Sequence, residues 1–181
     1  MASSATSARR YAEAVFELAS ETNTLDGWSA DLRAVADFVS EHDVAGILNS
    51  GRVPHDEKMR LLDAGIRQAV GPLTMNLIGM LGQRGKLGIA REIQVAFQEM
   101  LDERRGVAHA VVTTAVPLST DDQGTVAAKL SSLTGKTVDV TSVVDPAIIG
   151  GIIARIGDQL IDGSTRTRLV ALKRSLEGAA R

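Results

Sequence analysis

The sequence has no cysteine, which excludes disulfide frameworks, thiolate metal sites and cysteine nucleophiles. Aromatic residues make up only 3% of its 181 residues, and neither sign of charge dominates, because 20 lysines and arginines face 22 aspartates and glutamates. A dedicated nucleic-acid-binding domain usually carries a clustered basic stripe. The balanced charge therefore argues against nucleic acid as a partner.

Long hydrophobic runs are also lacking. The uncharged stretch at residues 69–82 is shorter than the roughly 20 apolar residues that span a bilayer, so we predict no direct membrane insertion. The first ten residues are rich in Ser and Ala and end in Arg9-Arg10, as in some targeting segments. Glu13 and Glu17 then interrupt the apolar core that a secretory signal requires. We interpret this segment as the start of a helix.

Apolar residues recur with helical spacing from residue 5 to residue 105, and 44% hydrophobic residues are enough for a sizeable core. Caps and stop signals interrupt the pattern at Asn23-Thr24, the segment 49–51, Pro54 and Gly71-Pro72. Six short helices are predicted, and they are expected to pack as a bundle. Their approximate ranges are 8–19, 25–39, 44–48, 54–70, 73–84 and 87–104.

The pattern changes at Gly106. Residues 107–115 and 138–144 are β-branched runs that predict strands. The segments 152–156 and 159–161 flank Gly157-Asp158 and predict a hairpin. The predicted fold is thus a two-domain α+β protein, with a helical bundle over residues 1–105 and an α+β domain over residues 106–181 that holds a β-sheet and two helices.

The two helices of the second domain have recognisable ends. The first helix begins with Thr120 and Gln123, which have the spacing of a capping box. Its expected inward stripe is Val126, Leu130 and Leu133, and Gly135 fits its C-terminal stop. Ser164 is expected to cap a last helix that carries Leu169, Leu172 and Leu176.

No catalytic chemistry is indicated. Residues 79–86 resemble a phosphate loop only faintly, because the spacing is too long, Leu87 replaces the metal-binding hydroxyl and a helix precedes the segment. Gly150-Gly151 is better explained by a close strand approach or a positive φ. The three histidines, His42, His55 and His109, are scattered and are expected to be surface residues. We predict no catalytic residue, cofactor or metal.

Two features are unusual. The first 51 residues hold eight acidic residues against three arginines, which is typical of a solvated face. The predicted helix at 73–84 is apolar on more than one face and contains Gly79 and Gly82. Such a helix is either central core or a groove wall against which a partner helix packs closely.

Several motifs resemble one family in their order along almost the whole chain. Residues 9–16 match the pattern R-x-Y-A-x-A-x-F. Asn76-Leu77 is similar to N-[FL], and the segment 84–87 is similar to N-G-R-L. The densest match is formed by residues 144–158 with 161–164 and Arg168-Leu169. The sequence resembles the δ subunit of F-type ATP synthases, the family of the mitochondrial oligomycin-sensitivity-conferring protein. It departs from the family pattern at Arg84, Lys86 and Ala147.

The resemblance implies a non-catalytic stator subunit. Family members have an N-terminal six-helix domain that binds N-terminal helices of α subunits on the catalytic head. Their C-terminal domain meets the b subunits of the peripheral stalk, and the joint keeps the head from turning with the rotor during proton-driven ATP synthesis. The expected setting is the cytoplasmic face of a bacterial plasma membrane, as a peripheral protein in single copy within a hetero-oligomer.

The resemblance also implies contact residues. For the α-subunit helix we predict one wall from the first helix and another from the fifth: Tyr11, Ala14, Val15, Leu18, Asn76, Leu77, Met80 and Leu81. For the b subunit we predict the basic face of the last helix: Arg166, Arg168, Lys173 and Arg174. The remaining motif residues are expected to be structural: Asp145, Gly150, Gly151, Gly157, Asp162, Gly163 and Ser164.

Two other classes stay open at this stage. A small enzyme could use Asp145, Asp162 or Ser164, and it would need a carboxylate with a perturbed pKa in a cleft. A generic helical adaptor or regulator would bind some other amphipathic helix through the fifth helix.

Overall fold

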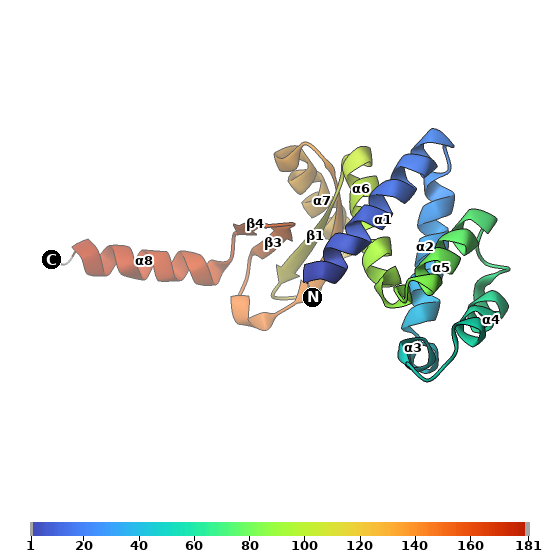
Figure 1. Cartoon of the computed structure of the whole chain (residues 1–181). Coiled ribbons are helices and arrows are strands. Elements are labelled where there is room, and N and C mark those ends of the chain that lie inside the picture. The colour runs from blue at the N-terminus through green and yellow to red at the C-terminus, as the bar shows by residue number, and fades with distance from the viewer. Residues whose placement is uncertain (1, 180–181) are drawn as a thin grey trace. The chain divides into compact units, whose positions relative to one another are not determined.

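The computed structural model describes residues 2–179, with side chains at residues 4–48 and 50–172 (Figure 1). The chain divides into two compact units, Met1–Leu101 and Asp102–Arg181. The boundary falls near the end of helix α6, Ala90–Arg105, four residues before the position predicted from the sequence. The predicted α+β class is confirmed by the helices and the mixed sheet.

The helical unit follows the predicted order of elements. It contains α1 (Ala2–Glu21), α2 (Leu25–Ser40), α3 (His42–Asn49), α4 (His55–Ile66) and α5 (Pro72–Gln83). The last predicted helix begins differently, because Leu87–Ile89 forms a separate 3₁₀ turn, η1, and the α-helix starts only at Ala90. Thr24 lies at the N-cap of α2 as predicted, but its side chain makes no capping hydrogen bond.

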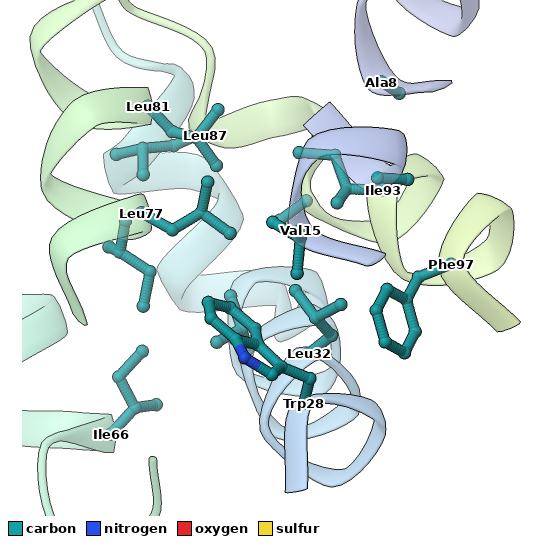
Figure 2. Close-up of a cluster of buried hydrophobic side chains, with 14 of the residues drawn as sticks. Ala8, Val15, Trp28, Leu32, Ile66, Leu77, Leu81, Leu87, Ile93 and Phe97 are labelled. Atoms are coloured by element: carbon teal, nitrogen blue, oxygen red, sulfur yellow. The ribbon is translucent and has the colours of Figure 1, made fainter. Parts of the chain in front are cut away.

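One core holds this unit together. The helical spacing of apolar residues over 8–19 predicts one buried stripe on α1, formed by Ala8, Tyr11, Ala12, Val15, Leu18 and Ala19. Four of them, Ala8, Ala12, Val15 and Ala19, are buried, whereas Tyr11 is partly exposed and Leu18 is 39% exposed. Figure 2 shows Val15 among side chains from α2, α5 and α6, with Trp28, Leu32, Leu77 and Ile93 around it. The rings of Phe16 and Phe97 meet edge to face at 5.5 Å between centroids. Because small alanines alternate with larger side chains along α1, the helix can approach its neighbours closely.

Asp31 ties α2 to the start of α5. Its Oδ2 atom accepts hydrogen bonds from the Gly71 N–H at 2.8 Å and from the Thr74 hydroxyl at 2.6 Å. Thr74 is only 1% exposed, so its hydroxyl depends on this partner. The carboxylate also lies at a helix N-terminus, where the helix dipole favours negative charge.

The second unit is built on a four-stranded sheet. Its elements are β1 (Val107–Thr114), α7 (Thr120–Thr134), β2 (Thr137–Val144), the 3₁₀ turn η2 (Pro146–Ile148), β3 (Ile152–Ile156), β4 (Gln159–Asp162) and α8 (Thr165–Ala179). The strand order is β2-β1-β3-β4, with β1 and β2 parallel and the other pairs antiparallel. Parallel strands need a crossover connection, which α7 provides. The predicted β3–β4 hairpin is confirmed, and Gly157 has φ +55° at its turn.

Two details of α7 differ from the prediction. The N-cap is Ser119, whose hydroxyl accepts from the Asp122 N–H, so the capping pair lies one residue earlier than Thr120 and Gln123. Leu130 is buried in the sheet core, but Leu133 is 63% exposed. The helix therefore covers the sheet with a narrower stripe than its sequence indicated. Gly135 ends it with φ +71°, as expected.

Gly151 has the role that its sequence context predicted. Its φ is +77°, and a β-carbon there would collide with the carbonyl oxygen of Gly163. Gly150 is close to the Thr165 hydroxyl, and the Gly163 N–H donates to the Ile152 oxygen at 2.9 Å. The glycines thus let the entry to β3 lie directly against the start of α8.

Candidate partner-binding surfaces

One face of α1 is exposed. Ala14 and Leu18 lie one turn apart and are exposed, and Tyr11, one turn earlier, is partly exposed. Val15, predicted on the same wall, is 6% exposed and belongs to the core. Tyr11, Ala14 and Leu18 are therefore accessible from outside, while Val15 packs beneath them.

The α5 wall divides in the same way. Asn76 and Met80 are exposed, whereas Leu77 and Leu81 are 6% and 2% exposed and pack into the core (Figure 2). Leu73, which we did not select from the sequence, is 49% exposed. The positions of Leu73, Asn76 and Met80, at i, i+3 and i+7, were a signal that could have identified it.

Two cations join the end of α5 to α1. The Lys86 ammonium donates to the Ser7 hydroxyl at 3.2 Å and lies 5.8 Å from the centroid of the Tyr11 ring. Arg84 donates to the Tyr11 hydroxyl at 3.5 Å. These contacts place the C-terminal end of α5 beside the first half of α1 (Figure 1). No periodic pattern indicates this meeting, since it depends on how the helices cross.

The start of α8 is fastened to the sheet. The Asp162 carboxylate accepts from the Ser164 N–H at 2.8 Å and from the Thr167 hydroxyl at 2.7 Å. Ser164 caps the helix by accepting from the Thr167 N–H at 3.2 Å, and the Thr165 N–H donates to the Gly150 oxygen. The hydrogen bond from the Ser164 backbone, and then that from Thr167, lower the pKa of Asp162.

The described side chains of α8 are not covered by other parts of the unit. Residues 165–172 are all exposed, including Arg166 and Arg168, and Leu169 and Leu172 are 52% and 56% exposed. The side chains of Lys173 and Arg174 lie outside the described residues. The described part of α8 therefore exposes leucines, and exposed apolar surface of this kind is typical of a partner-binding site.

The residues considered for catalysis have structural roles instead. Ser164 is 2% exposed and caps α8, and Asp145 accepts from the Ala147 N–H in η2. A lowered pKa makes the Asp162 carboxylate a weaker base, not a stronger one.

The histidines are exposed, as predicted. His109 lies 3.0 Å from Asp102 and 3.5 Å from Asp139, measured from ring nitrogen to carboxylate oxygen. Among the side chains that the structure describes, at residues 4–48 and 50–172, no three from His, Asp or Glu gather as metal ligands would. Among the described helices, none has the length and apolar character needed to cross a bilayer.

Comparisons with known proteins agree with the resemblance seen in the sequence. Residues 8–176 match the family described as ATP synthase delta (OSCP) subunit. The ATP synthase subunit delta of Dehalococcoides mccartyi strain 195 is 39% identical over 169 residues, which cover 93% of each chain. That of Brevibacillus brevis is 39% identical over 89% of this chain and 93% of its own. A chain of the Toxoplasma gondii mitochondrial ATP synthase hexamer superposes with a TM-score of 0.68 at 26% identity, covering 93% of this chain and 96% of its own.

Proposed function

This chain belongs to the ATP synthase delta (OSCP) subunit family, and from that premise we propose that its helical unit binds the catalytic head and its second unit binds the peripheral stalk. As a delta subunit it is a non-catalytic stator component of the F-type ATP synthase and a peripheral part of that membrane-bound complex. The proposed partners are the N-terminal helices of α subunits and the b subunits. The proposed location is the cytoplasmic face of a bacterial membrane, with one copy per complex.

The head contact is supported by exposed side chains on two helices, α1 and α5, and by Arg84 and Lys86, which join the end of α5 to α1. Ala14 is small and exposed, so a helix backbone can approach there closely. Tyr11 and Leu18 on α1, and Leu73 and Met80 on α5, add partly or largely exposed apolar surface. Val15, Leu77 and Leu81 would hold both walls in position from the core rather than touch the partner.

The test is calorimetric titration of the full chain with a peptide of roughly the first 25 residues of the cognate α subunit. We expect saturable one-to-one binding by the unmodified chain. Ala14→Asp should weaken it roughly a hundredfold or more, because burying an unpaired carboxylate costs several kcal/mol. At an exposed helix position the same change costs less than about 1 kcal/mol of stability, so the helical circular dichroism should persist.

Ala64→Asp is the matched control, since Ala64 is also an exposed helical alanine but lies on α4. It should bind like the unmodified chain. Undiminished binding by Ala14→Asp in a folded chain would place the head contact elsewhere.

The stalk contact is assigned to α8. Its described residues are exposed, its base is fixed by Asp162 and Ser164, and Arg166 and Arg168 give it positive charge. The hydrogen bonds at the base of the helix restrict the orientation of its first turn, which suits a joint that must resist torque. The leucines would supply the apolar contact and the arginines would meet carboxylates on the b subunits.

Charge reversal tests this assignment. The double variant Arg166→Glu with Arg168→Glu should weaken binding of a soluble C-terminal fragment of the b subunit about tenfold at low salt, and less at high salt where exposed charges are screened. Lys129→Glu, on the exposed face of α7, should leave the affinity unchanged. Equal affinities of the unmodified chain, the double variant and Lys129→Glu would show that the basic face of α8 does not take part in the stalk contact.

A further inference from the structure

We propose that the α1/α5 surface imposes a direction on the helix it binds, with the partner's carboxylates at the Arg84 and Lys86 end and the partner's cations beside Glu17 and Glu21. This inference rests on the proposed head contact and adds the charge pattern of the partner and the way it lies.

The cationic end is formed by residues far apart in the sequence. Lys86 and Arg84 follow α5, and both reach the first half of α1 through Ser7 and Tyr11. Within the described chain they contact hydroxyl groups and an aromatic ring, and none of these groups neutralises a positive charge. Arg10 is exposed on α1, one residue before Tyr11. Three positive charges therefore lie on or beside residues 7–11 of α1.

The acidic end lies further along the same helix. Ala14 and Glu17 are three residues apart, and so are Leu18 and Glu21, so the carboxylates border the exposed apolar face of α1. Arg10 precedes Ala14 by four residues and borders the same face at its beginning. Glu17 and Glu21 are both exposed. From Arg10 to Glu21 the border of the surface thus changes from positive to negative, and Glu13 between them is paired with Arg9 at 3.2 Å.

Such a surface discriminates between two directions of one amphipathic helix. Apolar contacts with Leu18, Leu73 and Met80 are similar in either direction, because they depend on area rather than on sign. Charge is not symmetric: in one direction carboxylates meet Lys86 and Arg84, and in the other like charges face each other at both ends. The favoured occupant is an amphipathic helix with acidic residues gathered toward one end and basic residues toward the other.

The experiment uses the full chain and the α-subunit N-terminal peptide, carrying a nitroxide label at either terminus. The label on the more acidic end should broaden the amide signals of Ser7, Gly85 and Lys86, and the label on the other end should broaden those of Leu18 and Glu21. The double variant Arg84→Glu with Lys86→Glu should weaken binding about tenfold at low salt, with a smaller loss at high salt. Arg60→Glu, an exposed reversal on α4, is the matched control and should change binding less than twofold.

A second double variant controls for the possibility that the first one unfolds the chain locally near Tyr11. Glu17→Lys with Glu21→Lys changes only exposed side chains and should weaken the same peptide similarly. Normal affinity in both double variants, or the opposite pattern of broadening, would overturn the directional inference while the Ala14→Asp result still supports the head contact. If the unmodified chain bound no peptide, both the head contact and its direction would be overturned.

Discussion

At the scale of single residues, Asp31 holds the first turn of α5 and with it the wall that faces the proposed partner. Asp31→Ala would leave the buried Thr74 hydroxyl and the Gly71 N–H without their acceptor. An unsatisfied buried donor costs about 1–3 kcal/mol, so the helical unit should lose at least about 2 kcal/mol of unfolding free energy. Urea unfolding followed by the fluorescence of Trp28, the sole tryptophan of the chain, measures this unit directly.

Asp37→Ala is the control for that measurement. Asp37 is an exposed aspartate on the same helix, and surface changes of this kind usually stay within about 0.5 kcal/mol. Equal unfolding midpoints for the two variants would show that Asp31 does not hold α5 in place.

At the scale of elements, the attachment of α8 should depend on pH through Asp162. The pKa of this carboxyl is lowered in the folded chain because it accepts hydrogen bonds from Ser164 and Thr167. A depressed folded pKa means that the stabilisation is complete above the unfolded value of about 3.9 and is lost as pH falls through the lower folded value. Below about pH 4 the first turn of α8 should therefore fray.

Amide exchange at Ser164 and Thr167 measures this fraying. Asp162→Asn keeps the shape but removes the titrating group. The protection of these two amides, relative to free exchange at the same pH, should therefore be lower at neutral pH and should not fall further in acid. A loss of protection in acid that persists in Asp162→Asn would assign the effect to another carboxyl group.

Elements were predicted from the sequence more securely than surfaces were. Periodicity identified the buried stripe from Ala8 to Ala19, and Gly157-Asp158 identified the hairpin, because these signals lie within one segment. Periodicity did not separate Leu77, which is buried, from Met80, which is exposed, since α5 is apolar on both sides. The approach of Lys86 to Ser7 and the hydrogen bonds of Asp31 to α5 join distant segments, and no local pattern specifies such contacts. The cap of α7 was misplaced by one residue because Ser119 and Thr120 are both suitable capping residues.

At the scale of the whole molecule, the two units have separate cores. The helical core extends from Ala8 to Leu101, the sheet core includes Val112, Leu130 and Ala154, and the two clusters of described residues have no member in common. Because the cores are separate, each unit can fold without the other, and a change at one proposed partner surface should leave the other proposed surface intact. We therefore expect core substitutions to act on one unit at a time.

Phe97→Ala and Leu130→Ala test this independence. Each removes a side chain that is at most 2% exposed, and such truncations cost about 3–5 and 2–5 kcal/mol respectively. Phe97→Ala should shift the Trp28 unfolding transition to lower urea and leave the amide protection of Val112 in β1 unchanged. Leu130→Ala should lower that protection and leave the Trp28 transition in place. If either variant changed both the Trp28 transition and the Val112 protection, the units would unfold together. A destabilising change at the proposed head contact would then also affect the proposed stalk contact.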